Sequence, residues 1–459
     1  MIEGRDSAGE VIDAVADTGS GARPLWRKDI VGWSLYDFAN TIYSMNITSM
    51  YLKRYIVEDL HFGDRWFDIP FSISMLFAAL LLPALGALSD HSTKKKTFLF
   101  LFTLTCCSAV GLMALVPNWA IGAIVVLFIV ANFSYEAGQP FYNALLYSVA
   151  EGRQARLVSG IGVSLGYVGS IVGLSLVSVF VTGELFGWDV PFISAGGKEA
   201  AFLPTAVLFM VFALPVFWWV KERSEIIPTK IKMVQAYRDV WDGVRQTRKY
   251  PGVLRFLIAD YFVEDAVATV IINMGIFCSV VLGLGEEQIT LFLIVSTVTA
   301  VLGSLVIGII ARHWSLKHLM TVIIIGWIIS LVLFVLTDNM TLIWILGSLV
   351  GVLLGGVWTT SRPLLAELVP RNELGRFFGL FALSGRAAAV VGPLLWTLVV
   401  YLAHPDRVLG RLFNQMLHLD QHGAERLPYQ LAVLSLAGMM LIGLVIFLKV
   451  PHTARGDHG

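Results

Sequence analysis

Charged residues inside long apolar stretches are the strongest chemical signal in this sequence. The chain contains about twelve such stretches, each long enough to cross a lipid bilayer as a helix. A charge at the bilayer centre costs roughly 2.5–3.5 kcal/mol on insertion scales, so it must face protein or water rather than lipid. Away from the ends of the stretches, the charges fall in the first, fourth, seventh, tenth and eleventh, and are Asp37, Glu136, Asp260, Glu264, Asp265, Arg362 and Arg386.

The distribution of these charges predicts which helices face a cavity. The third, sixth, ninth and twelfth stretches carry no Asp, Glu, Lys or Arg. We therefore expect every third helix to face lipid, and the first, fourth, seventh and tenth helices to face a central cavity. Such a pattern is typical of a transporter built from two repeated bundles.

The adjacent carboxylates Glu264 and Asp265 are the sharpest local feature. Asp265 lies about twelve residues into the stretch 253–283, which places it near the midplane at a rise of about 1.5 Å per residue. Two nearby carboxylates in a medium of low dielectric constant disfavour each other's ionisation, so the pair predicts proton coupling or cation binding. The alternative is a structural ion pair with Arg255, Arg362 or Arg386.

The two arginines are candidates for contact with an anionic group of a solute, because a guanidinium pairs with a carboxylate through two bonds. Arg386, near the midplane, is the stronger candidate, and its alternative is a permanent salt bridge to Asp265 or Asp37. Arg362 lies near the inner end of the stretch 341–365. We expect it to reach the interface or close an inner gate, with solute contact as the alternative.

Two stripes of polar residues add to these charges. Spacings of three and four place the members of each stripe on one face of a helix. We expect the stripes to line a cavity, and the alternative is hydrogen bonding between helices. The stripes are Asp37, Asn40, Thr41, Ser44 and Thr48 in the first stretch, and Asn132, Tyr135, Glu136, Gln139 and Asn143 in the fourth.

These residues must be positioned by an all-α integral membrane fold of twelve helices in two pseudo-symmetric six-helix bundles. Residues 1–28 and 450–459 are expected to be tails, the former disordered. The bundles are expected at 29–220 and 253–449, joined by a linker at 221–252 that carries an amphipathic helix. Gly392–Pro393 is expected to bend the eleventh helix. The predicted spans are 29–53, 69–89, 97–116, 119–148, 156–182, 201–220, 253–283, 287–311, 318–337, 341–365, 375–402 and 430–449.

Lys and Arg residues predict the orientation of the bundles. They are concentrated at the termini and in the even-numbered loops, so both termini are expected to be cytoplasmic. The formal net charge of zero implies no nucleic-acid partner. All nine His residues lie in loops, in tails or, for His318, at the first residue of a stretch, and the three Cys residues lie within the stretches as small hydrophobes. The sequence therefore predicts no metal site, no cofactor and no enzyme.

The halves of the chain resemble each other and a known family. Aligning Asp37 with Asp265 also aligns Thr41 with Thr269. The segment GALSDHSTKKK resembles the loop signature of the major facilitator superfamily. The segments GWSLYDFANTIYS and RFLIADYFVEDAVATVIINM resemble the first and seventh helices of its autophagy-22-like, or UMF1, branch. The chain departs from that branch at Val263–Ala266, where Tyr-Asn-Asp-Gly is usual. The resemblance implies a secondary transporter, and amino-acid efflux in some eukaryotic members.

The loop signature also predicts a cytoplasmic gate. Asp90 at the end of the second helix is expected to pair with Arg153 or Arg156 when that side closes. The alternative is a solvated loop that only sets the orientation. The gate residues are Gly86, Asp90, Lys94, Lys95, Lys96, Arg153 and Arg156.

We therefore expect a proton-coupled transporter of a small polar or zwitterionic solute such as an amino acid, working by alternating access. An exporter of amphipathic or lipid-like compounds is the first alternative, using aromatic residues such as Tyr135, Tyr261 and Trp358. A membrane sensor without transport is the second. The expected partners are a small solute, a coupling proton or cation and the lipid bilayer. We expect a monomer in the inner membrane of a bacterium.

Overall fold

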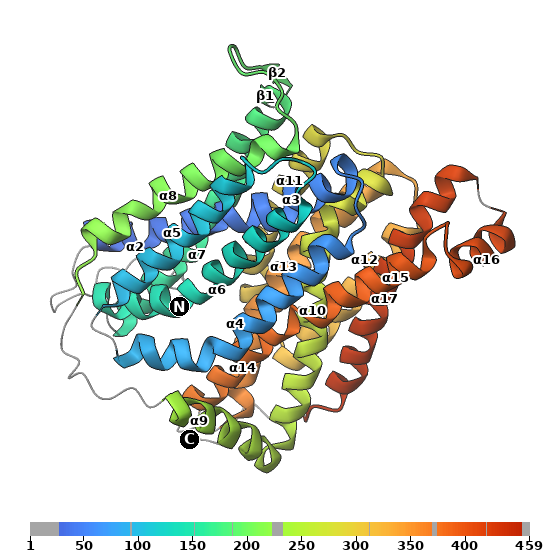
Figure 1. Cartoon of the computed structure of the whole chain (residues 1–459). Helices are drawn as coiled ribbons and strands as arrows, with labels where there is room; N and C mark the ends of the chain where they lie inside the picture. The colour runs from blue at the N-terminus through green and yellow to red at the C-terminus, as the bar shows by residue number, and fades with distance from the viewer. Residues whose placement is uncertain are drawn as a thin grey trace, which may run out of the picture.

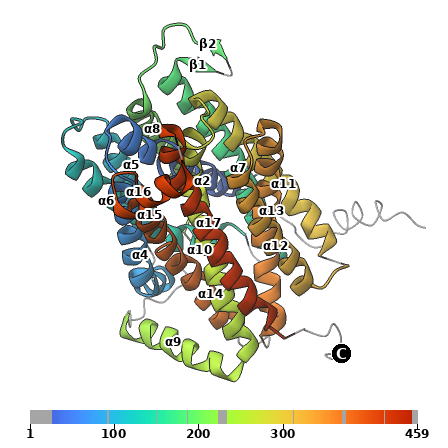
Figure 2. The same ribbon diagram turned by 90° about the vertical axis from the view of Figure 1, so that its right-hand side faces the viewer.

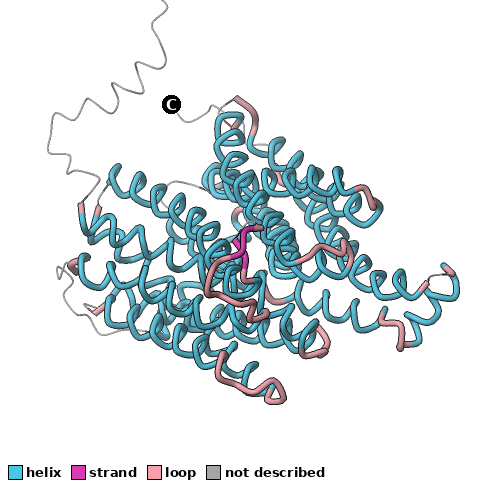
Figure 3. Tube along the Cα trace, turned by 90° about the horizontal axis from the view of Figure 1, so that it is seen from above, coloured by secondary structure: helices cyan, strands magenta, loops and turns pink. Residues whose placement is uncertain are grey.

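The computed structural model of the chain is almost entirely helical (Figures 1 and 3). It describes residues 27–451 except 92–93, 151, 186, 223–232, 312, 370–373 and 419. The elements in order are α2 (Lys28–Tyr43), η1 (Ser44–Tyr51), α3 (Leu52–Arg54), η2 (Tyr55–Asp59), α4 (Arg65–His91), α5 (Lys95–Met113), α6 (Ile121–Val149), α7 (Gly152–Thr182), β1 (Glu184–Leu185), β2 (Trp188–Asp189), η3 (Lys198–Ala201), α8 (Phe202–Trp219), α9 (Met233–Gln246), η4 (Thr247–Lys249), α10 (Pro251–Val280), α11 (Glu286–Ile310), α12 (Leu316–Leu336), α13 (Met340–Leu368), α14 (Leu374–Ala388), α15 (Val391–Ala403), α16 (Val408–Leu417) and α17 (Gln421–Leu448).

Eleven helices in the described part of the chain are long and apolar enough to cross a membrane. A further crossing runs from Lys28 to Asp59 and is divided into α2, η1, α3 and η2, of which η1 and η2 are π-helical. No single helix in that crossing therefore has the length of the others. Large apolar side chains such as Leu305, Ile309 and Leu441 are exposed, as a lipid-facing surface requires.

The helices form two bundles, which we call the N-terminal half (α2–α8) and the C-terminal half (α10–α17). In the N-terminal half, α2 packs on α7 and α8, and α6 packs on α4 and α5. In the C-terminal half, α11 and α12 pack on α13, and α10 and α12 pack on α17. The halves meet where α4 contacts α14 and α15, where α7 contacts α11, and where η1 contacts α10.

The amphipathic helix α9 lies at one end of the bundles and contacts both α4 and α14 (Figures 1 and 2). The Tyr237 hydroxyl donates a hydrogen bond of 2.9 Å to the Leu80 carbonyl, while Val234, Trp241 and Val244 remain exposed. We call this end of the molecule the α9 face. The opposite end, where β1 and β2 form a short antiparallel hairpin, is called the hairpin face.

Three features of the C-terminal half and the loops go beyond the expected spans. The eleventh crossing is divided, because α14 ends at Ala388 and α15 begins at Val391. A further amphipathic helix, α16, follows it with Leu412 and Met416 exposed. The last crossing begins at Gln421, where the Asp420 side chain accepts a hydrogen bond from the Gly423 N–H and caps the helix.

Candidate functional site

A cavity of about 550 Å³ lies between the two halves and is lined by charged residues. Asp37 and Trp33 of α2 and Tyr142 and Asn143 of α6 line it from the N-terminal half, and Arg362 of α13 lines it from the C-terminal half. Gly86 and Lys95, at the α9-face ends of α4 and α5, also line it. The cavity therefore reaches toward the α9 face.

Asp37 is half-buried in the wall of this cavity because α2 and α7 approach each other closely. A Cβ atom at Gly162 of α7 would lie 2.9 Å from Asp37 Oδ2 and 2.7 Å from the Trp33 ring. One turn further along, the Thr41 hydroxyl donates a hydrogen bond of 2.6 Å to the Gly166 carbonyl. Glycine at these positions lets the helices pack closely and leaves the carboxylate at the cavity.

Aromatic rings support this carboxylate from one side. The Trp33 and Tyr142 rings stack with their centroids 4.7 Å apart, and the Trp33 indole N–H donates a hydrogen bond of 3.1 Å to the Tyr142 carbonyl. Tyr36 also stacks on Tyr142, with centroids 4.8 Å apart. The wall beside Asp37 is consequently rigid and largely apolar.

Asp265 has a different environment. Its side chain is fully buried, and both carboxylate oxygens accept the Gly392 N–H, at 2.8 and 2.9 Å. Gly392 is in the first turn of α15, whose backbone N–H groups have no partner within the helix. Asp265 therefore caps α15 from α10 and helps to hold the break in the eleventh crossing.

Glu136 and Arg386 form an ion pair between α6 and α14, and so between the two halves. Of the partners considered for Arg386 from the sequence, neither Asp37 nor Asp265 pairs with it in the described part of the chain. Glu264 accepts a hydrogen bond of 3.4 Å from the Trp358 indole N–H. Tyr261 is half-buried on α10, and Trp358 on α13 is exposed.

The polar stripes of the first and fourth crossings divide between cavity lining and helix packing. Gln139 Nε2 donates a hydrogen bond of 3.1 Å to Asn40 Oδ1, which joins α6 to α2. Asn132 Nδ2 donates a hydrogen bond of 2.8 Å to Ser74 Oγ, which joins α6 to α4. The Tyr135 ring packs on Tyr43, with centroids 4.8 Å apart. Asp37 and Asn143 are the stripe members that line the cavity.

The residues expected to form a gate are only partly described. The Lys96 ammonium donates a hydrogen bond of 2.7 Å to the Val220 carbonyl, and its backbone N–H bonds to Glu222. These contacts tie α5 to the end of α8 within the N-terminal half. Lys94 is exposed at the start of α5. The side chains of Asp90, Arg153 and Arg156 lie outside the described residues, so their expected pairing stays a prediction.

The hairpin face is closed by a buried polar network that joins the two halves. Lys53 Nζ lies 2.8 Å from Asp64 Oδ1 and 2.8 Å from Asp68 Oδ2, and it also bonds to Asn273 of α10. All three charged side chains are at most 4% exposed. Because Asn273 belongs to the opposite half, this network holds the halves together at the hairpin face.

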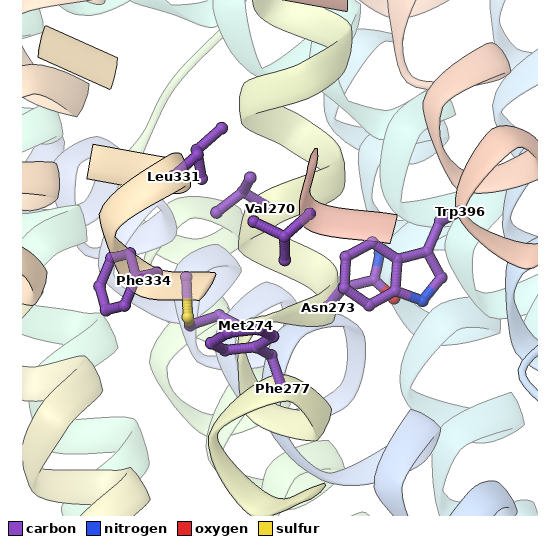
Figure 4. Close-up of a pocket in the computed structure, with 8 residues that line it drawn as sticks. Val270, Asn273, Met274, Phe277, Leu331, Phe334 and Trp396 are labelled. Carbon is purple, nitrogen blue, oxygen red and sulfur yellow. The ribbon is translucent and has the colours of Figure 1, made fainter. Parts of the chain in front are cut away.

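Further donors from the C-terminal half complete the network. Asp64 accepts hydrogen bonds from the Trp396 indole at 3.2 Å and the Tyr429 hydroxyl at 3.1 Å, and Asp68 accepts one from Thr397 at 2.7 Å. Figure 4 shows Trp396 and Asn273 beside a small apolar pocket of about 10 Å³. That volume is barely enough for one water molecule, so the helices are tightly packed here.

A second ion pair lies beside this network. The two terminal nitrogens of Arg54 lie 2.6 and 2.7 Å from the two Glu286 oxygens, which is the two-bond geometry of a strong pair. None of these residues was selected as a site residue from the sequence. One available signal was the spacing of Asp64 and Asp68, which places a carboxylate just before the second helix and another one turn later on the same side.

Comparisons with known proteins agree with this architecture. The family model described as "Vacuole effluxer Atg22 like" matches residues 68–417. The uncharacterised MFS-type transporter YxiO of Bacillus subtilis (strain 168) is 26% identical over 432 residues, which cover 93% of this chain and 95% of that protein. Autophagy-related protein 22 of Kluyveromyces lactis is 24% identical over 456 residues, covering 83% and 89% of the two chains.

Solved structures of transporters share the fold at low sequence identity. A point mutant of the nucleoside transporter NupG superposes with a TM-score of 0.70 at 14% identity, covering 92% of this chain and 99% of that one. A bacterial homologue of the human lysosomal transporter Spinster, solved in an inward-facing and unoccupied conformation, also gives a TM-score of 0.70, at 12% identity and with coverage of 94% and 98%. The chain is a multi-pass membrane transporter of the major facilitator fold and belongs to the Atg22-like family.

Proposed function

We propose that this transporter moves a small zwitterionic solute of the amino-acid class by alternating access, driven by a proton gradient. The observation that carries the proposal is the presence of Asp37 and Arg362 in the lining of one cavity, from opposite halves. An α-amino acid needs an acid for its ammonium group and a guanidinium for its carboxylate. A solute held by both residues bridges the halves, so its binding is coupled to their movement.

The size and walls of the cavity support a solute of this class. A volume of about 550 Å³ lies within the usual range of about 300–1,000 Å³ for small-molecule sites. The stacked Trp33 and Tyr142 rings offer an apolar wall for a side chain. Arg386 is engaged by Glu136, so we assign the first contact with the solute carboxylate to Arg362.

Alternating access follows from the contrast between the two ends of the molecule. The hairpin face is closed by the Lys53 network, and the cavity reaches toward the α9 face. We propose that the α9 face and both termini are cytoplasmic, in the inner membrane of a bacterium. The burial of Lys53 and Arg54 supports this orientation, because it leaves fewer basic loop residues on the hairpin face.

The proposed solute class is tested by a thermal-shift screen of the purified full-length protein. A ligand that binds only the folded protein raises its melting temperature by mass action. Amino acids should raise it, while nucleosides, sugars and lysophospholipids at the same concentration should not. Stabilisation by lysophospholipids alone would favour an exporter of lipid-like compounds. If an amino acid binds but does not cross the membrane of reconstituted vesicles, the protein is a sensor.

The orientation is tested separately with single cysteines and an impermeant thiol reagent in intact cells. A cysteine replacing Lys95 should be protected, and one replacing Glu425 should react. The opposite pattern would reverse the proposed orientation. The native residues Cys106, Cys107 and Cys278 are buried, which keeps the background low.

A further inference from the structure

Asp260 is a carboxyl group that the fold buries without giving it a hydrogen-bond donor. It belongs to α10 and is 2% exposed. Neither of its oxygens accepts a hydrogen bond from the residues that the structure describes. A buried carboxylate without partners costs several kcal/mol, so a group in this setting needs a donor, a cation or a proton of its own.

Ser361 of α13 is a polar side chain close enough to Asp260 to interact with its carboxyl group. Its hydroxyl donates a hydrogen bond of 2.9 Å to the Val357 carbonyl, which commits its single hydrogen. The Ser361 oxygen can therefore still accept a hydrogen bond, but the hydroxyl has no second hydrogen to donate. A protonated Asp260 can donate a hydrogen bond to the Ser361 oxygen. An ionised Asp260 could not, because the carboxylate and the Ser361 oxygen would then both be acceptors.

Glu264 lies one helical turn after Asp260, on the same face of α10. Two carboxylates at this separation in a medium of low dielectric constant are not readily ionised together, so the pair favours sharing one proton. Glu264 is in turn linked to α13 by its hydrogen bond from Trp358 and by the charge of Arg362. Arg362 also lines the cavity, so the pair is one side chain away from the solute.

The other charged groups on the elements around α10 lie toward the two ends of the molecule. Lys53 and Arg54 of α3 and Glu286 of α11 lie at the hairpin face, and Lys249 of η4 and Glu367 of α13 lie toward the α9 face. The helix α17, which packs along α10, has no charged residue between Arg426 and Lys449. The elements α15 and η1 contain none, and Arg386 of α14 is paired with Glu136. Glu264 acts on Asp260, and Arg362 acts on Glu264 across the contact between α10 and α13. Asp265, beside Glu264 on α10, is engaged by the Gly392 N–H.

We propose that Asp260 and Glu264 together hold one exchangeable proton between α10 and α13, and that this proton is the one coupled to solute movement. The coupling of this proton to solute movement rests on the proposed function, whereas the proton site itself does not depend on it. A solute carboxylate on Arg362 partly neutralises the positive charge beside Glu264, so the pair keeps its proton. When the solute leaves, the O–H bond breaks, the electron pair stays on the carboxylate, and the proton passes to water in the cavity.

The site is tested directly by infrared spectroscopy of the full-length protein in lipid vesicles without any solute. A protonated carboxyl group absorbs at a higher frequency than a carboxylate, and its band shifts in heavy water. We expect one such band at neutral pH to be lost in Asp260→Asn and retained in Asp260→Glu. Glu264→Gln should shift the band without removing it. The matched variants Asp37→Asn and Asp265→Asn should leave it unchanged.

The outcomes separate this site from the proposed function. A spectrum unchanged by Asp260→Asn overturns the proton site, whatever the solute. The coupling is tested in the same vesicles with radiolabelled L-alanine as the probe. Asp260→Asn should lose accumulation driven by a pH gradient and keep exchange of alanine down its own gradient. Loss of the infrared band with unchanged accumulation overturns the coupling. Absence of alanine transport in the wild type contradicts the proposed function for this solute but leaves the band assignment standing.

Discussion

Asp37 and Asp265 occupy equivalent positions in the two halves of the chain, yet their structural roles differ. Each lies in the first crossing of its half and touches a glycine of the fifth, Gly162 or Gly392. The helix α7 is continuous at Gly162, and Asp37 is left in the wall of the cavity. The eleventh crossing is broken before Gly392, and Asp265 is fully buried as the cap of α15.

This difference shows that two residues that align between the halves can occupy equivalent positions and still have different structural roles. The break in the helix exposes backbone N–H groups that need an acceptor, and the nearest carboxylate is recruited for that purpose. The hairpin-face ends of α2 and α10 also have different roles, although the two helices are equivalent. The former continues into Lys53 and Arg54, which bind the other half, and the latter ends in the uncharged sequence Phe277–Val281.

The largest effect is expected from removing the cation at the end of the first crossing. Lys53→Met leaves Asp64 and Asp68 buried without their cation, and breaking such a pair costs about 3–5 kcal/mol. The closed hairpin face should therefore open. A cysteine at Ser72, whose hydroxyl donates to the Val390 carbonyl, should label several-fold faster from that face. The control Arg426→Met removes a cation whose ion pair with the exposed Asp338 lies within the C-terminal half, and it should change labelling little. Equal labelling in all three proteins would contradict the proposed closure.

The next effect concerns the contact between α10 and α15. A Cβ atom at Gly392 would lie 2.0 Å from Thr269 Oγ1, so Gly392→Ala should force these helices apart and destabilise the protein by about 1–3 kcal/mol. The contact of Thr41, the residue that aligns with Thr269 in the other half, is looser. A Cβ atom at Gly166 would lie 3.3 Å from Thr41 Cγ2, and Gly166→Ala should have the smaller effect on the melting temperature.

A double variant shows whether the contact between residues 392 and 269 causes the loss of stability in Gly392→Ala. Combining Thr269→Ala with Gly392→Ala removes the nearest atom that the new methyl group would meet, and leaves the contacts with Asp265. The melting temperature should recover in part, because the two substitutions then share one space. Simple addition of the two single effects would contradict the proposed contact.

The smallest effect is expected from a comparison that distinguishes two roles of Asp265, namely capping α15 and carrying a charge. Asp265→Asn keeps an oxygen that can accept the Gly392 N–H, and Asp265→Ala does not. Loss of a helix cap costs about 1 kcal/mol, so the alanine variant should melt at a lower temperature than the asparagine variant. Asp37→Ala and Asp37→Asn should melt alike, because Asp37 caps no helix in the described structure. If Asp265→Asn alone abolished proton-driven accumulation, Asp265 would be the coupling residue that the sequence suggested.

The architecture could be predicted from the sequence because its signals are local. Runs of apolar residues determine the crossings, and the expected transporter fold and family are confirmed. The equivalence of Asp37 and Asp265 could likewise be predicted from the sequence, since the two residues lie in similar segments. The expected bend at Gly392–Pro393 is a complete break, because Asp265 from another helix stabilises a new helix start there.

The rest could not be predicted because it depends on contacts between distant segments. Lys53 lies at the end of an apolar stretch, where a sequence cannot distinguish a loop charge from a buried one. Its partners come from the second crossing and the opposite half. The pairing of Arg386 with Glu136 similarly required the relative placement of α6 and α14. The assignment of the remaining site residues stays a proposal.

The central claim is that a zwitterion binds between Asp37 and Arg362, and it is tested by matching ligands to variants. The measurement is the dissociation constant of L-alanine, N-acetyl-L-alanine and L-alaninamide for the wild type, Asp37→Asn and Arg362→Gln. Arg255→Gln is the control, because Arg255 is an exposed guanidinium that donates to the Lys449 carbonyl.

We expect the wild type and the control to bind L-alanine at least about tenfold more tightly than either derivative, which corresponds to about 1.4 kcal/mol. Asp37→Asn should lose the preference for a free amine and keep the preference for a free carboxylate. Arg362→Gln should do the reverse. The same ranking of the three ligands in all four proteins would contradict the account.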